Sequence, residues 1–117
     1  MKYSVICGVP VVRSLEEPVA GASAAVELIA SLRHETGCEK MVLFKECLDE
    51  SFFRLSSGLA GEVLQKFVNY QMRLAIVGDF SHYTSKPLQD FIRESNQGRQ
   101  VGFWSTEEEA LDWLGGG

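Results

Sequence analysis

The chain has 117 residues, of which 45% are hydrophobic and 23% are charged, and its formal net charge is −5. This length fits one domain, and the composition is too apolar for a disordered chain. The acidic balance argues against a nucleic-acid-binding protein, and no apolar run approaches the roughly 20 residues that cross a bilayer. We therefore expect a single globular domain with neither a nucleic acid nor a membrane as partner.

The chain opens with two short β-branched stretches. Residues 2–7 (KYSVIC) and 9–14 (VPVVRS) flank Gly8, which predicts two strands joined by a tight turn, or a hairpin at the edge of a sheet. Pro10 fits an edge strand, because the hydrogen-bond donor that proline lacks is not needed there.

The rest of the chain alternates between helix and strand patterns. Short apolar runs bounded by charge or glycine predict strands, and apolar residues three and four apart predict helices. The predicted elements are a helix over 22–37, a strand over 40–46, a helix over 59–68, a strand over 73–80, a helix over 88–95, a strand over 99–105 and a helix over 105–114.

Serine residues precede several of these helices. Ser23 and Ser85 are predicted N-caps, and Ser105 with Glu108 forms the S-x-x-E pattern of a capping box. Gly37 is predicted to end the first helix.

The order β-β-α-β-α-β-α-β-α predicts an α/β fold with a mostly parallel five-strand sheet and helices packed on it. Residues 41–45 (MVLFK) and 74–79 (LAIVGD) are the expected central strands. One domain covers residues 1–117, and we expect the closing LGGG to be a frayed end.

The three cysteines, Cys7, Cys38 and Cys47, show no CxxC spacing, and their odd number favours a reducing compartment. We therefore expect a cytoplasmic protein. His34 and Cys38 stand four residues apart, but Gly37 interrupts the helix between them and no second ligand pair follows. We expect no metal site and no cofactor.

Ligands of open α/β sheets collect outside the carboxyl ends of the strands. Four segments of this chain are expected there: 45–50 (KECLDE), 54–59 (RLSSGL), 78–87 (GDFSHYTSKP) and 105–109 (STEEE). The connection that begins at Lys45 is long for a small domain, so we expect it to be functional or separately structured. Phe52 and Phe53 are expected to attach it to the core.

The segment 78–87 is the densest polar cluster of the sequence. Two interpretations stay open: a solvated loop that ends in a helix cap, or a binding loop in which Tyr83 and Lys86 contact a ligand or partner. The candidate residues are Asp79, Ser81, His82, Tyr83, Thr84 and Lys86, with Ser85 as the cap.

A second candidate lies at the start of the helix over 59–68, where Ser56, Ser57 and Gly58 precede it. Ser57 is either a cap alone or a hydroxyl that is chemically used. A catalytic interpretation takes Ser57 as nucleophile, His82 as base and Asp79 as its orienting partner, although no G-x-S-x-G motif accompanies them.

From about residue 23 to 114 the sequence resembles the bacterial domain of unknown function 4180 family. The segments that carry the resemblance are GLAGEVLQKFVNY, LAIVGDFSHYTSKPLQDFI, ESNQGRQ and EEALDWL. Because this family is uncharacterised, the resemblance implies a fold and no activity.

The element order also resembles that of the STAS domain, found in sulfate transporters and anti-sigma-factor antagonists. The antagonists carry D-S-S-G-L before their second helix, and a partner kinase phosphorylates the second serine. LSSGL here is similar, with Leu55 in place of the aspartate. The resemblance implies a STAS-like fold and phosphorylation at Ser57.

Together these observations predict a non-catalytic protein-interaction or regulatory module, switched at Ser57, with another protein as partner. The alternatives are a small-molecule-binding domain that uses the crevice at the carboxyl ends of the strands, and a hydrolase-like enzyme.

Overall fold

A computed structural model describes residues 2–116 and confirms the predicted α/β fold. Its elements follow the predicted order, β-β-α-β-α-β-α-β-α. The strands are β1 (Ser4–Ile6), β2 (Val9–Val12), β3 (Lys40–Phe44), β4 (Arg73–Val77) and β5 (Val101–Trp104). The helices are α1 (Ala22–Thr36), α2 (Leu59–Asn69), α3 (Lys86–Gln97) and α4 (Glu107–Gly116).

The strands lie in the sheet in their chain order, from β1 to β5. β1 is antiparallel to β2, and the other pairs are parallel. β3 and β4 are interior strands, as predicted. The predicted hairpin is at the edge, but β1 forms that edge and β2 does not. Pro10 lies opposite Val5 of β1, and it is tolerated in β2 because the pairing with β3 begins only at the next residue, Val11.

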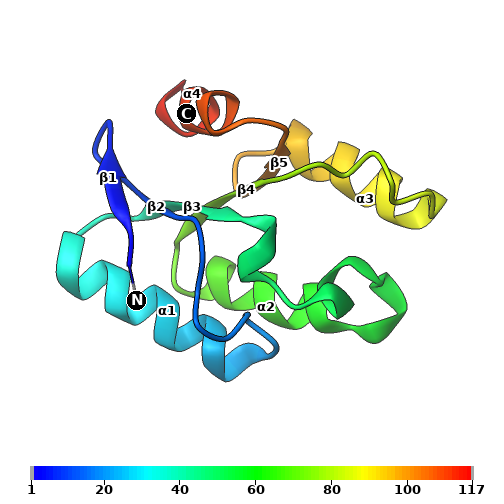
Figure 1. The fold of residues 1–117 in the computed structure, drawn as a ribbon, viewed down its shortest axis with the longest axis horizontal. Helices are drawn as coiled ribbons and strands as arrows, with labels where there is room; N and C mark the ends of the chain where they lie inside the picture. The colour runs from blue at the N-terminus through cyan, green and yellow to red at the C-terminus, as the bar shows by residue number, and fades with distance from the viewer. Residues whose placement is uncertain (1, 117) are drawn as a thin grey trace.

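Helices cover both faces of the sheet. Right-handed crossovers between strands in sequential order place the connecting helices on one face. Side chains of α1, α2 and α3 accordingly share the larger core, and Ala110 and Leu114 of α4 pack on the opposite face. Figure 1 shows α4 on one side of the sheet, α1 and α2 on the other, and α3 beside β5.

The start of α1 differs from the prediction. The helix begins at Ala22 after Gly21, whose carbonyl accepts a hydrogen bond from the Ala25 amide at 3.2 Å. Ser23 therefore lies within the helix, and the prediction that it is the N-cap is wrong. The stop at Gly37 is confirmed, because this residue is left-handed (φ 71°) and its amide bonds to the Arg33 carbonyl.

The capping box of α4 lies one residue later than predicted. The Glu109 amide donates to Thr106 Oγ1 at 3.1 Å, and the Thr106 hydroxyl donates to the Glu109 carboxylate at 3.2 Å. Thr106 therefore caps the helix instead of Ser105, and Glu109 takes the role predicted for Glu108. The helix continues through Gly115 and Gly116, and the last glycine of the tail lies outside the described residues.

The long connection between β3 and α2 is built from three short 3₁₀ turns: η1 (Lys45–Cys47), η2 (Glu50–Phe53) and η3 (Leu55–Ser57). Phe52 and Phe53 are buried in the larger core, which confirms that they anchor it. The connection is thus separately structured, as expected. Within residues 2–116, no helix combines the length and the apolar character needed to cross a membrane.

The burial of Cys47 predicts a difference in thiol reactivity. Its Sγ donates to the Val12 carbonyl at 3.4 Å, and burial raises the pKa of the thiol to about 11. Because the thiolate is the reactive form, Cys47 should resist alkylation in the folded protein, whereas exposed Cys7 should react. Timed iodoacetamide labelling with peptide mapping checks this. Equal labelling rates at Cys7 and Cys47 would contradict the fold described here.

Candidate functional site

The candidate site begins where β3 and β4 end. These strands are parallel neighbours, with Phe44 beside Val77, so the residues that follow them share one edge of the sheet. The Lys45 side chain crosses directly over Gly78, where an added Cβ would lie 2.6 Å from Lys45 Cβ. The absence of a side chain at Gly78 therefore lets Lys45 reach the loop 79–85.

Lys45 connects this loop to the end of β3. Its Nζ lies 3.4 Å from His82 Nε2 and 4.9 Å from the centre of the Tyr83 ring. The His82 and Tyr83 rings are 4.1 Å apart. An ammonium group over an aromatic face is an attractive arrangement, and it holds Tyr83 against the first residue after β3.

Tyr83 connects the same loop to η2. Its hydroxyl donates to Glu50 Oε1 at 2.9 Å, and its ring stacks on Phe53 with centroids 5.1 Å apart. Phe80 lies against Phe53 at 5.8 Å and meets Phe103 of β5 edge-on. We call Phe53, Phe80 and Tyr83 the aromatic cluster, and residues 45–57 and 79–85 the edge loops. The aromatic cluster fastens one edge loop to the other.

The environment of Tyr83 predicts a loss of stability at alkaline pH. Burial raises the pKa of Tyr83, and the hydrogen bond to Glu50 and its negative charge act in the same direction. In the unfolded chain this phenol ionises near its ordinary pKa of about 10, whereas in the folded protein it stays protonated at that pH. The contribution of the Tyr83 hydroxyl to the free energy of unfolding is therefore lost as the pH rises above about 10.

Tyr83→Phe removes the hydroxyl, so it should lower the free energy of unfolding by about 1 kcal/mol at neutral pH. The difference from wild type should then shrink above about pH 10. Urea titrations at several pH values measure this, with Tyr70→Phe on the exposed end of α2 as the matched control. A constant difference between Tyr83→Phe and wild type at all pH values would refute the prediction.

Asp79 organises the loop that follows β4. Its Oδ1 accepts from the Ser81 amide at 2.9 Å and from the Ser81 hydroxyl at 2.6 Å, and these bonds lower the pKa of Asp79. The charges of His82 and Lys45 lower it further. Asp79 therefore acts as a turn-forming residue. Asp49 forms the same Asp-x-Ser turn at the start of η2.

Ser57 is exposed and its hydroxyl makes two hydrogen bonds. It donates to the Ser51 carbonyl at 2.6 Å and accepts from the Leu59 amide at 3.2 Å. The N-cap position of α2 is Gly58, which is left-handed (φ 79°), and not Ser57 as predicted. The second bond still satisfies the free N–H group of Leu59, from one residue before the cap. The first bond was not predicted. The Ser57 side chain thus connects the first turn of α2 with η2.

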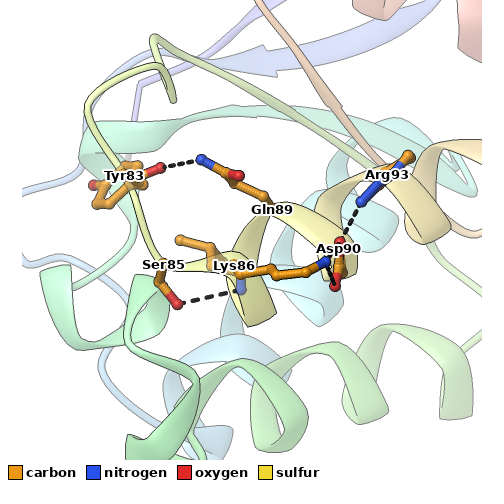
Figure 2. Close-up of polar contacts among 7 residues, drawn as sticks. Tyr83, Ser85, Lys86, Gln89, Asp90 and Arg93 are labelled. Atoms are coloured by element: carbon orange, nitrogen blue, oxygen red, sulfur yellow. Dashed lines mark hydrogen bonds and ion pairs between the residues drawn. The ribbon is translucent and has the colours of Figure 1, made fainter.

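Lys86 has a different partner from the one expected for a binding residue. Its Nζ lies 3.1 Å from Asp90 Oδ2, one turn along α3, and its side chain is 82% exposed. Figure 2 shows Lys86 and Arg93 converging on the Asp90 carboxylate. Lys86 therefore lies along its own helix and is not brought together with Tyr83.

Two other contacts hold the loop 79–85 to α3. Ser85 accepts from the Leu88 amide at 3.4 Å, which confirms it as the N-cap. Gln89, which was not among the predicted residues, donates from Nε2 to the Tyr83 carbonyl at 3.0 Å (Figure 2). The other predicted residues, Ser56 and Thr84, are exposed.

The structure does not bring the three residues of the catalytic interpretation together. Within residues 2–116 no hydrogen bond joins Ser57 to His82 or His82 to Asp79, and each of the three has the partners described above. In the same part of the chain, no group of three or more His, Cys, Asp or Glu side chains is placed to hold a metal ion.

Fold and site together define a small, mostly parallel α/β domain whose two edge loops are joined by an aromatic cluster and a bridging serine. The chain belongs to the family described as Domain of unknown function (DUF4180), whose model matches residues 7–114. This confirms the family that the sequence resembled. Comparison with curated proteins and with solved structures found no match.

Proposed function

We propose that this domain is a regulatory protein-interaction module, that the edge loops form its partner surface, and that modification of Ser57 switches it. The observation that carries the proposal is the hydrogen bond from the Ser57 hydroxyl to the Ser51 carbonyl. This bond depends on a proton that modification of the hydroxyl removes.

Ser51 lies in the turn that holds Tyr83. η2 supplies the Glu50 carboxylate that accepts from the Tyr83 hydroxyl and the Phe53 ring on which Tyr83 stacks. Tyr83 in turn contacts Lys45 and His82. A displacement of η2 therefore reaches both edge loops through direct contacts.

Phosphorylation would act on the two hydrogen bonds of Ser57 in opposite ways. A phosphoryl group adds about −1.5 to −2 charges, cannot donate to the Ser51 carbonyl, and repels that oxygen. The Leu59 amide and the positive end of the α2 dipole favour the added charge. The helix would stay in place while η2 moves. Because Glu46, Asp49 and Glu50 are nearby in the sequence, the surface would also become strongly negative.

Other features support this function over its alternatives. The element order is the one that STAS domains have, and LSSGL stands at the start of the second helix, which supports a STAS-like switch despite Leu55 in place of the aspartate. The rings of the aromatic cluster stack on one another between the edge loops, which favours a macromolecular partner over a small molecule. The separate partners of Ser57 and His82 disfavour a hydrolase. A protein kinase that phosphorylates Ser57 is a partner that fits the expected cytoplasmic location.

The experiment is quantitative capture of partners from an extract of the source cells. Immobilised wild type, Ser57→Asp and Ser57→Thr are compared with Ser56→Asp, which adds the same charge one residue away. A specific partner should be retained by wild type, Ser57→Thr and Ser56→Asp, and reduced about tenfold with Ser57→Asp. If no protein distinguishes Ser57→Asp from Ser56→Asp, the proposed switch is wrong.

A further inference from the structure

The strand β5 forms one edge of the sheet. Among residues 2–116, β5 pairs with β4 and with no other strand, so one side of β5 faces away from the sheet. Exposed strand edges present unpaired N–H and C=O groups to which another chain can add a strand. Natural sheets protect such edges against strand addition, for example by covering them with a helix or a loop.

The pairing with β4 shows which residues of β5 face outward. The carbonyls of Gln100 and Trp104 accept from the Leu74 and Gly78 amides of the β4 segment, each at 3.0 Å. Backbone groups of successive residues in a strand point alternately to its two sides. The N–H and C=O groups of Val101 and Phe103 therefore point outward, and those of Phe103 lie near the middle of the free edge.

Asn96 of α3 satisfies both groups of Phe103. Its Nδ2 donates to the Phe103 carbonyl at 3.0 Å, and its Oδ1 accepts from the Phe103 amide at 2.6 Å. A primary amide carries a donor and an acceptor side by side, as a peptide group does. Asn96 thus bonds to β5 in the way that a neighbouring strand would.

α3 is placed to deliver this side chain. Figure 1 shows the helix beside β5 at the end of the sheet, and Phe91 meets Phe103 edge-on at 5.9 Å. Leu88 is the one fully buried hydrophobic residue among the described residues of α3. Phe91 and Ile92 are partly buried and pack against the same core. The two hydrogen bonds of Asn96 hold the last turn of the helix against β5.

We propose that the Asn96 side chain takes the place of a sixth strand. By bonding to Phe103, Asn96 prevents another chain from adding a strand to the β5 edge. When this side chain is removed, a second copy of the chain pairs with the edge, β5 to β5. In an antiparallel pair centred on Phe103, the two copies of Phe103 exchange both backbone hydrogen bonds, so each copy replaces the donor and the acceptor that Asn96 supplied. A two-fold axis makes such an interface self-complementary.

The test compares wild type with Asn96→Ala and with Asn69→Ala, which removes an exposed asparagine bonded only to its neighbour Gln65 in the described part of α2. Sedimentation velocity over a wide concentration range gives the mass, and amide hydrogen exchange gives the protection of the Phe103 N–H. At low concentration, the Phe103 amide of Asn96→Ala should exchange about tenfold faster than that of wild type. At high concentration, the mass of Asn96→Ala should double relative to wild type and protection at Phe103 should return.

Asn69→Ala should match wild type in both measurements. If Asn96→Ala keeps the wild-type mass at every concentration, or if its Phe103 amide stays as protected as in wild type at low concentration, the proposal is overturned. If Asn96→Ala does not fold, the exchange rate of the Phe103 amide in wild type still tests the proposal. This amide must be protected like the paired amides of β4, and rapid exchange there would equally overturn the proposal.

Discussion

Phe67→Ala should lower the free energy of unfolding by about 3–5 kcal/mol, the range typical of a fully buried phenylalanine. Phe67 lies on the inner face of α2 and has no solvent exposure, because the helix packs it against the sheet in the larger core. Removing the ring leaves a cavity that close-packed neighbours fill only in part. Urea denaturation followed by circular dichroism measures the change.

The next residue along the helix supplies the control. Val68 is 46% exposed, so Val68→Ala should change the free energy of unfolding by less than about 0.5 kcal/mol. Two adjacent substitutions with very different effects would locate the buried face of α2. Similar effects at both positions would mean that α2 does not pack on the sheet as described.

Phe52→Ala should have an effect of similar size and a local consequence as well. Phe52 is the buried residue of η2 that packs in the larger core, and its ring meets Phe53 edge-on at 5.0 Å, so it supports the turn that positions Tyr83. We expect a loss of about 3–5 kcal/mol in the free energy of unfolding. We also expect faster amide exchange across η2 than across α1 in the same variant, because the anchor of the turn is gone.

Arg54→Ala is the matched control for Phe52→Ala, since Arg54 is exposed in the same connection. It should leave the free energy of unfolding within about 0.5 kcal/mol of wild type. If Phe52→Ala were equally harmless, the long connection would not be anchored through its aromatic residues, and the proposed coupling through η2 would lose its basis.

The elements and their order could be predicted because each has a local hydrophobic period, and the alternation of strand and helix constrains the sheet. The cap of α4 could not be assigned, because Ser105 with Glu108 and Thr106 with Glu109 are overlapping capping patterns. The choice between the two patterns depends on which face of α4 packs on the sheet, and the structure buries the face that contains Ala110. Ser23 failed as a cap for a different reason: alanines on both sides of it extend the helix back to Ala22.

The edge loops were also predicted, since ligand sites of α/β sheets follow the carboxyl ends of strands. Their contacts were not, because Lys45 and His82 are 37 residues apart and Glu50 and Tyr83 are 33 apart. Such pairs depend on how the connection folds back. The partner of Lys86 was accessible from the sequence, because an aspartate four residues ahead on a helix lies on the same face.

The most direct test of the central claim, that the Ser57 hydroxyl holds η2 in place, is residue-resolved amide exchange in Ser57→Asp with Ser56→Asp as control. Aspartate still accepts from the Leu59 amide but cannot donate to the Ser51 carbonyl. The Arg54 amide, which also bonds to the Ser51 carbonyl, should exchange about tenfold faster in Ser57→Asp, while the amides of α2 stay protected. Ser56→Asp should match wild type. Unchanged exchange at Arg54 in a folded Ser57→Asp protein would contradict the account and leave Ser57 as a helix cap alone.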